Sequence, residues 1–175
     1  MVNIQGVNKW TPLTTAASQG YAEVVKVLLQ YGDNPDLEMP GGWPTGSPLL
    51  HAVKNNHPKV VEILCKAKAK VNIHCPPNNL TPLMESIDMG YTEVVKALLK
   101  YGKGLDVEMR GGRLSETALH RAVSQNNPEI VELLCKAGAN VHAETGTYLG
   151  DLTTPLGMAR YKGYSEVVKI LVRYK

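Results

Sequence analysis

The sequence contains no phenylalanine, few cysteines and no long run of apolar residues. Only 6% of its 175 residues are aromatic, and three are cysteines, too few for a framework of disulfide bonds. No apolar run approaches the roughly 20 residues that a membrane-spanning helix needs. The first ten residues, MVNIQGVNKW, lack the apolar segment of a signal peptide. We therefore expect no membrane insertion and a cytoplasmic location by default, with the periplasm or delivery into a host cell left open.

The motifs of common enzymes and metal proteins are missing too. The sequence has no G-x-S-x-G, H-E-x-x-H, phosphate-binding loop or dinucleotide fingerprint. His74 and Cys75 are adjacent, but no second ligand pair follows at the spacing of a zinc site. A net charge of +3 is too small to indicate nucleic-acid binding, and Lys66, Lys68 and Lys70 form only a short basic run. We expect a protein that is not an enzyme and uses no cofactor, metal, nucleic acid or small-molecule substrate.

The sequence does have a hydrophobic fraction of 43% and a triplet that occurs five times. The triplets begin at residues 11, 47, 81, 117 and 154, at intervals of 34 to 37 residues, and most read Thr-Pro-Leu. Each is followed by small residues and then by two hydrophobic pairs four residues apart, such as Val94-Val95 and Leu98-Leu99. Self-similarity at such a period is typical of a repeat protein. We expect one domain, 1–175, with repeats at roughly 7–39, 40–73, 74–109, 110–143 and 144–175.

A longer period overlies the first. Residues from about 10 to 71 align with those from about 80 to 141 at a constant offset of 70, which places Gly41-Gly42 on Gly111-Gly112. The simplest history is duplication of a two-repeat unit. The fifth repeat resembles the first and third, with Gly163-Tyr164 where they have Gly20-Tyr21 and Gly90-Tyr91.

The third repeat shows the physical logic of one unit. The hydroxyl of Thr81 predicts an N-cap, Pro82 suits the first helical position, and Gly90 suits the end of a short helix over 82–89. A second helix opens at Thr92 or Glu93, carries the two hydrophobic pairs on one stripe and stops at Gly102. Loose alternation over 105–114 predicts a β-hairpin turning at Gly111-Gly112.

Such a repeat cannot bury its apolar stripe alone, because helices this short are marginal in isolation. Stacked neighbours bury the stripe from both sides, which contributes roughly 1.5–3 kcal/mol per fully buried side chain. Cys65 and Cys135 fall in the second hydrophobic pair, so we interpret them as small core residues. The expected architecture is a ladder of helix pairs with hairpins on one side.

The pattern T-P-L-x-x-A-x-x-x-G-x-x-x-V-V-x-x-L-L-x-x-G resembles the ankyrin repeat, about five times over nearly the whole chain. The resemblance implies an all-α repeat solenoid of helix-turn-helix units with projecting β-hairpin loops. It also implies a protein that binds other proteins, as a scaffold, substrate adaptor or inhibitor, and carries no catalytic machinery. One departure is that the family's histidine after the triplet is present only as His120, so we expect less rigid junctions elsewhere. Asn56 and Asn126 replace the glycine between helices, and asparagine tolerates the left-handed conformation.

In ankyrin-like stacks a partner contacts the hairpin tips and the exposed side of the first helix. Mapped onto this sequence, those positions hold Trp10, Ser18, Gln19, Trp43, Lys54, Asn55, Leu80, Asp88, Met89, Arg113, Glu116, Ser124, Gln125, Tyr148, Tyr161 and Lys162. Trp43, Arg113 and Tyr148 stand out, because Trp, Tyr and Arg dominate interface hot spots. Trp43 contacts a partner or lies on its own hairpin, and Trp10 contacts a partner or shields the open end of the stack.

Three functional hypotheses follow. The first is a module that binds one folded protein, for example as an inhibitor or immunity protein whose hairpins enter a partner enzyme's cleft. The second is a recruiting or targeting segment of a larger protein such as a secreted effector, because residues 2–4 match the end of a repeat and the last helix lacks a polar outer face. The third, an enzyme or nucleic-acid binder, has no motif in its favour.

Overall fold

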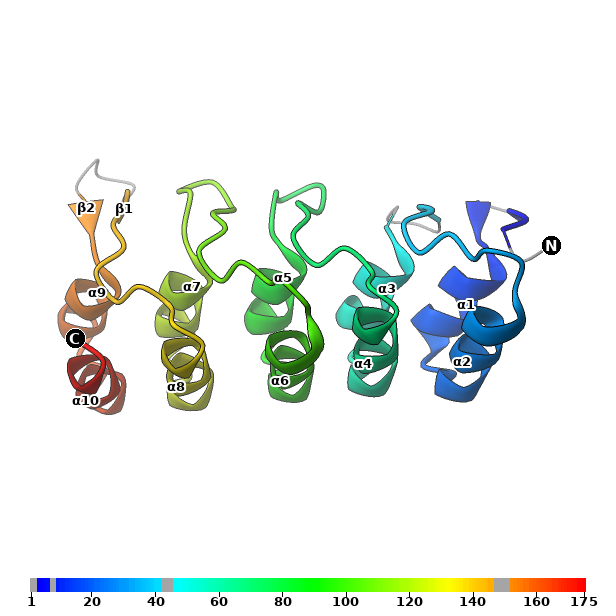
Figure 1. Ribbon diagram of the computed structural model, residues 1–175. Coiled ribbons are helices and arrows are strands. Elements are labelled where there is room, and N and C mark those ends of the chain that lie inside the picture. Colours follow the sequence, from blue (N-terminus) through cyan, green and yellow to red (C-terminus); the bar gives the residue numbers. More distant parts are fainter. Residues whose placement is uncertain (1–2, 7–8, 42–45, 147–151) are drawn as a thin grey trace.

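The computed structural model describes residues 3–6, 9–41, 46–146 and 152–175, which form ten helices arranged as five antiparallel pairs (Figure 1). The pairs, numbered here repeats 1 to 5, stand in one row along the chain. The first helices are α1 (Pro12–Gln19), α3 (Pro48–Lys54), α5 (Pro82–Asp88), α7 (Ala118–Ser124) and α9 (Pro155–Tyr161). The second helices are α2 (Ala22–Tyr31), α4 (Pro58–Lys66), α6 (Thr92–Tyr101), α8 (Pro128–Lys136) and α10 (Ser165–Arg173).

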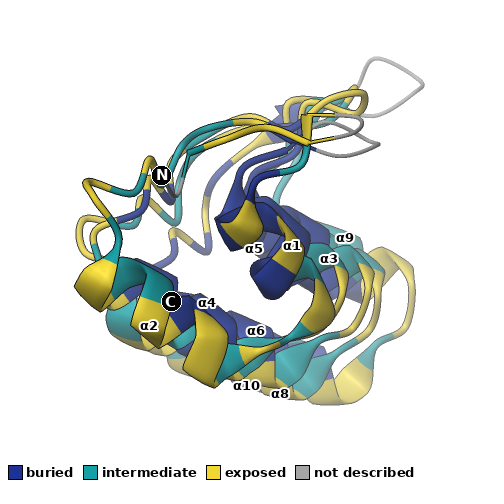
Figure 2. Cartoon of the chain, turned by 90° about the vertical axis from the view of Figure 1, so that its right-hand side faces the viewer, coloured by how far each residue is buried: buried dark blue, intermediate teal, exposed yellow. Residues whose placement is uncertain are grey.

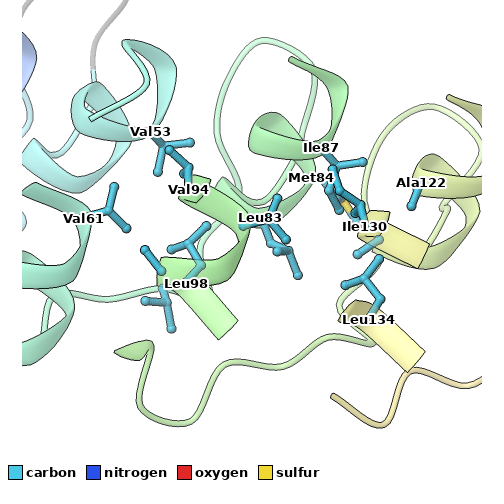
Figure 3. Packing of buried hydrophobic residues seen from close by; sticks show 14 of the residues in the cluster. Val53, Val61, Leu83, Met84, Ile87, Val94, Leu98, Ala122, Ile130 and Leu134 are labelled. Atoms are coloured by element: carbon cyan, nitrogen blue, oxygen red, sulfur yellow. The ribbon is translucent and has the colours of Figure 1, made fainter. Parts of the chain in front are cut away.

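First and second helices form two layers, and the loops between repeats project together to one side (Figure 2). Buried side chains lie between the layers and between neighbouring pairs, in one cluster that runs from repeat 1 to repeat 5. Figure 3 shows the middle of this cluster, where α4, α6 and α8 meet the first helices. The expected all-α repeat solenoid is confirmed.

The helix ends follow the local chemistry of the sequence. Thr81 Oγ1 accepts a hydrogen bond from the Met84 N–H at 3.2 Å, and Pro82 opens α5 without losing an intrahelical donor. Gly90 follows α5 with a φ of 69°. Asn56 and Asn126 take its left-handed role in repeats 2 and 4, with φ of 57° and 50°. These expectations are therefore confirmed.

The β-hairpin predicted over 105–114 is wrong in the position of its turn, and the loops between repeats form few strands among the described residues. Among the described residues the one two-residue ladder pairs β1 (Thr145–Gly146) with β2 (Leu152–Thr153). The loop of repeat 4 closes instead by a single bridge, Gly111 to Glu116, so the turn lies at 112–115. Gly111 serves a close approach: a Cβ there would lie 2.6 Å from the carbonyl oxygen of Asn79 in the preceding loop. Gly41 approaches the Lys9 carbonyl in the same way.

Hydrogen bonds join neighbouring loops, and the same bond recurs at the 70-residue period of the duplicated unit. The Glu38 carboxylate accepts from the backbone N–H of Lys70 at 2.7 Å, and Glu108 accepts from that of Asn140 at 2.8 Å. Both partners of the second bond lie 70 residues beyond those of the first. These bonds join the segment after repeat 1 to that after repeat 2, and the segment after repeat 3 to that after repeat 4.

The three cysteines are buried. Cys65 and Cys135 lie in the core as expected, with 2% and 6% of their surface exposed. Cys75, which the sequence placed in a loop, is fully buried because its backbone bridges to Leu80. Burial raises the pKa of the Cys65 and Cys75 thiols to about 12 and that of Cys135 to about 11, so none is a reactive thiolate near neutral pH.

The residue that directly follows the triplet differs from repeat to repeat. In repeat 4 it is His120, and both of its ring nitrogens have hydrogen-bond partners. Its Nδ1 accepts from Thr117 N–H at 3.4 Å and lies 2.8 Å from Thr117 Oγ1, which leaves Nε2 to donate to the Thr153 carbonyl at 3.4 Å. His120 thus joins repeat 4 to repeat 5. Thr14 forms its own capping box with Thr11, while Leu50 and Met84 are simply buried.

Val24 and Val94 test how much the stacking of repeats contributes to the free energy of unfolding. They occupy the same helix position in repeats 1 and 3, but Val24 is 46% exposed and Val94 is fully buried against repeat 2. We expect Val94→Ala to lower the free energy of unfolding by about 2 kcal/mol and Val24→Ala by about 1 kcal/mol or less. Urea denaturation of both variants measures this, and equal losses would contradict it.

His120 predicts a loss of stability in acid. Burial lowers its pKa from 6.5 to about 4, so between these values the unfolded chain binds a proton that the folded chain does not. The contribution of neutral His120 to the free energy of unfolding is therefore fully present above pH 6.5, and it is lost as the pH falls towards 4. We expect wild type to lose about 3 kcal/mol relative to His120→Met between pH 7 and pH 4. Parallel pH profiles of the two proteins would refute the assignment.

Candidate partner-binding surface

Ten of the predicted contact residues lie in one line. They form a pair at the end of each first helix, because stacking repeats the same position every 34 to 37 residues. The pairs are Ser18-Gln19, Lys54-Asn55, Asp88-Met89, Ser124-Gln125 and Tyr161-Lys162. The second member of every pair is exposed, and the first is half-buried except for Tyr161, which is 93% exposed. We call this line the first-helix edge.

The half-buried members of the first-helix edge also hold neighbouring repeats together. Ser18 Oγ accepts from the Asn55 side chain at 3.3 Å, and its carbonyl meets His57 Nε2 at 2.9 Å. Lys54 Nζ lies 3.7 Å from the Glu85 carboxylate. Sequence reasoning assigned these residues to a partner alone, because contacts between residues more than 30 positions apart leave no local signal.

A cavity of about 190 Å³ opens where repeats 3 and 4 meet. Its lining consists of Asn78, Leu80, Asp88, Gly112, Arg113, Leu114, Glu116 and Arg121. Four predicted contact residues, Leu80, Asp88, Arg113 and Glu116, are thus brought together. The expectation that Leu80 is an exposed contact residue is wrong. Only 4% of its surface is exposed, because its backbone bridge to Cys75 turns it inward, where it lines the cavity wall.

Arg121 is the functional candidate that sequence reasoning missed. Its Nη1 lies 2.5 Å from Asp88 Oδ2 and its Nη2 lies 3.0 Å from Glu116 Oε2, so it joins α5, α7 and the loop before α7. Its Nε is buried and has no hydrogen-bond partner within the described residues. The signal was available: the same position after the triplet holds the charged Glu85 in repeat 3.

The two carboxylates around Arg121 are not fully compensated. Burial raises the pKa of Asp88 above its usual range despite the attraction of Arg121. Burial also raises the pKa of Glu116, and the neighbouring Asp88 adds to that rise while Arg121 and Lys162 oppose it. One guanidinium thus lies between two carboxylates that burial deprives of solvent.

The predicted aromatic and loop-tip contact residues lie in different surroundings. Trp10 is half-buried, and its ring centroid lies 4.8 Å from that of His51, so it packs on repeat 2. Arg113 is exposed at the cavity rim. Trp43 and Tyr148 lie outside the described residues.

A larger hollow of about 750 Å³ lies on the second helices α4, α6 and α8, away from the first-helix edge. Its rim is occupied by ion pairs, such as Lys59 with Glu62 at 3.0 Å and Lys96 with Glu93 at 2.8 Å. Hydrogen bonds from Lys66 and Lys59 lower the pKa of Glu62 to about 2. These charges satisfy one another, which is the usual state of a solvated helix face.

Within the described ranges, no helix is both long and apolar enough to cross a membrane. In the same part of the chain, no three His, Cys, Asp or Glu side chains gather as metal ligands.

Comparison with known proteins identifies the repeats. The family model described as ankyrin repeats (3 copies) matches residues 1–75, 34–110, 69–145 and 113–175. Among curated relatives, glycerophosphocholine phosphodiesterase gde1 of Schizosaccharomyces pombe is 37% identical over 72% of this chain and 11% of its own length. The potassium channel AKT2/3 of Arabidopsis thaliana is 35% identical over 75% of the chain and 15% of its length. The ankyrin repeat and KH domain-containing protein mask-1 of Caenorhabditis elegans is 32% identical over 93% and 6%.

The Glu116 carboxyl predicts a pH effect opposite to that of His120. A carboxyl whose pKa is higher in the folded chain than its usual 4.5 destabilises the fold once the pH rises past that value. We therefore expect wild type to lose stability relative to Glu116→Gln as the pH rises from about 4.5 towards neutrality. Denaturation across this range checks it, and a relative gain by wild type would show that Arg121 dominates instead.

Proposed function

The chain belongs to the ankyrin-repeat family, and from this premise we propose that it is a non-catalytic module that binds one folded protein partner. Ankyrin repeats are generally protein–protein interaction modules whose stacking builds an extended binding surface. The observation that carries the proposal is the cavity between repeats 3 and 4, because it unites residues from two first helices, α5 and α7, and from two loops.

The exposed side chains of the first-helix edge support this surface. Met89 is 53% exposed and Tyr161 is 93% exposed, although large apolar side chains are usually buried when the fold can bury them. Arg113 adds an exposed guanidinium at the cavity rim. Tyrosine and arginine are common hot-spot residues, and methionine adapts to irregular partner surfaces. The partner would lie along this edge, with one side chain entering the cavity.

The two poorly solvated carboxylates of the cavity bear on which partner side chain enters it. Asp88 and Glu116 share one guanidinium, and both have a raised pKa because they are poorly solvated. A positively charged or hydrogen-bond-donating partner side chain would complete their solvation, whereas an anionic one would meet repulsion. We propose that this difference contributes to partner choice.

Two forms of the function remain proposals. As an inhibitor or immunity protein, the chain would cover a partner enzyme's active site with its loops. As a recruiting or targeting segment, it would act for a larger protein. The second form is favoured by one observation: the chain spans 6–15% of the length of the three relatives described above, whose names denote a phosphodiesterase, a channel and a KH-domain protein. We further propose a cytoplasmic location.

A pull-down from native lysate tests the surface. The bait variant carries Met89→Ala, Arg113→Ala and Tyr161→Ala, three exposed positions whose loss leaves the core intact. Because hot-spot truncations cost more than about 1 kcal/mol each, we expect the captured partner to bind at least ~30-fold more weakly when its affinity is then measured with purified proteins.

The matched control replaces three exposed residues of the second helices, Gln30→Ala, Lys59→Ala and Lys100→Ala, which keeps the number of truncations equal. It should retain wild-type affinity. A partner that binds the edge variant as tightly as wild type, and loses affinity to the control, would place the site on the opposite face. A second bait with Trp43→Ala and Tyr148→Ala extends the test to the remaining predicted tips.

A further inference from the structure

The hollow of about 750 Å³ on the second helices follows the length of α6. One face of this helix lines it from end to end, from Glu93 in the first turn through Ala97 to Tyr101 at the last residue. The helices α4 and α8 stand on either side of α6 in the row and complete the lining (Figure 1). From residue 93 to residue 101 a helix rises about 12 Å, a little more than two turns. The hollow is therefore an elongated groove, and we call it the α6 groove.

One small residue opens the α6 groove. Ala97 lines the groove, and the equivalent position in the other four repeats holds a larger side chain, namely Val27, Ile63, Leu133 and Ile170. Repeat 3 thus lacks the two or three carbon atoms that every other repeat has at this place. The groove is therefore a departure of repeat 3 from the repeat pattern, and it is not a gap that stacked helix pairs must leave.

Apolar surface lies beside this gap. Tyr101 of α6, Leu133 of α8 and Pro58 of α4 line the groove and are half-buried. Concave sites lined by apolar side chains are where ligands bury their own apolar groups. A leucine or isoleucine of a partner has the carbon atoms that Ala97 lacks, so it fits the gap.

One ammonium group at the rim of the α6 groove lacks an anion. In repeats 2 and 4 the lysine at the end of the second helix bonds to a glutamate one turn earlier, at 2.6 and 3.2 Å. Lys100, the lysine at this place in repeat 3, has Lys96 one turn earlier instead, and Lys96 is itself bonded to Glu93 and Glu129 at 2.8 and 2.9 Å. Lys100 lies 5.1 Å from the centroid of the Tyr101 ring, but among the described residues it has no carboxylate partner. A carboxylate of an occupant would pair with it without breaking an existing ion pair.

The length of the groove and its single unpaired charge favour a helical segment of a protein as the occupant. A groove about two turns long accepts a helix that lies along α6, because the apolar anchors of one helix face recur at that spacing. Ala97 and Lys100 are three residues apart on α6, so an apolar and an acidic residue one turn apart on the occupant reach both. Attraction to an anionic lipid surface needs several unpaired lysines together, whereas Lys66 and Lys136 beside Lys100 are bonded to glutamates.

We propose that the α6 groove binds a short amphipathic helix of a protein partner, which places a leucine or isoleucine over Ala97 and a carboxylate against Lys100. The apolar side chain fills the space that repeat 3 leaves open, and the carboxylate supplies the missing ion pair. The site lies in the other helix layer from the first-helix edge, so it does not depend on the partner proposed for that edge (Figure 2). The chain would then hold two proteins at once, one on each layer.

A synthetic helix tests the proposal by fluorescence anisotropy with the full chain. The probe is a fluorescein-labelled, alanine-based peptide of about 14 residues, because shorter isolated helices are marginal. It carries two leucines one helical turn apart, and each is followed one turn later by a glutamate. We expect it to bind wild type with a Kd on the order of 10 to 100 μM. No binding at protein concentrations up to about 1 mM would overturn the proposal.

Ala97→Ile tests the apolar anchor, because isoleucine already stands at this position in repeats 2 and 5. The larger side chain fills the gap, so the peptide should bind at least ~10-fold more weakly. The melting temperature should stay at or above that of wild type, since filling a gap does not weaken the fold. Wild-type affinity in this variant would show that the gap is not used and would refute the proposal.

Lys100→Gln tests the ion pair. It should weaken binding of the glutamate peptide about 3- to 5-fold. It should leave binding of a peptide with glutamines in place of the glutamates unchanged, because the pair is then already lost. The matched control, Lys103→Gln, removes an exposed lysine of the same repeat outside the groove and should change the affinity less than ~2-fold. Equal losses from the two variants would mean a diffuse basic surface, and binding of phosphatidylserine vesicles in place of the peptide would mean a membrane; either result overturns the proposal.

The edge variant described above, Met89→Ala with Arg113→Ala and Tyr161→Ala, separates this site from the first-helix edge. It should bind the peptide as tightly as wild type, because none of its three residues lines the α6 groove. Failure of this site and failure of the proposed edge are thereby distinguishable. A loss of peptide affinity in the edge variant would place the peptide on the edge and count against the groove.

Discussion

Each helix pair has an apolar stripe that it cannot bury by itself, and the whole structure depends on neighbouring pairs burying it. Val94 and Leu98 of α6 are fully buried only because repeats 2 and 4 stand on either side. Short helices are marginal without such packing, so no repeat is stable alone. Both end repeats consequently differ from the inner ones: repeat 1 leaves valines and tyrosines exposed, and repeat 5 has Arg160 where the others have a buried Ala, Val or Ile.

Stacking also accounts for the loops. Because every pair is placed in the same way, equivalent loops meet, and the same bond between a carboxylate and a backbone N–H recurs 70 residues later, two repeats along the row. Gly111 and Gly41 allow the backbone of one loop to touch the next, which a Cβ would prevent. The loops therefore form a regular row beside the helices, and a regular row can present a continuous surface to a partner.

The first-helix edge alternates residues that contact the next repeat with residues that are exposed. The half-buried residue of a pair contacts the next repeat, as Lys54 contacts Glu85 and Asp88 contacts Arg121, while the following residue faces solvent. The edge residue is the cation at the first of these junctions and the anion at the second, and in each case the next repeat supplies the opposite charge. At the second junction Glu116 adds a second carboxylate to Arg121, and both line the cavity.

The sequence by itself determined the local elements. Thr81 before Pro82, Gly90 after the first helix and hydrophobic pairs four residues apart act within one or two turns, so their consequences can be derived from spacing alone. The repeat number and the solenoid followed from the returning triplet. The line of exposed residues at the first-helix ends also followed, because repetition of a position implies repetition of its environment.

Only the tertiary structure decided which side chains meet across repeats. Arg121 joins Asp88 of another repeat, Gly111 is a contact to the preceding loop rather than a turn, and Leu80 and Cys75 are turned inward by their bridge. These partners are separated along the chain by gaps whose loop lengths vary from repeat to repeat, so the sequence period does not specify their registration. Their positions depend on how closely two helix pairs pack, and that distance is set by all the side chains of the junction together.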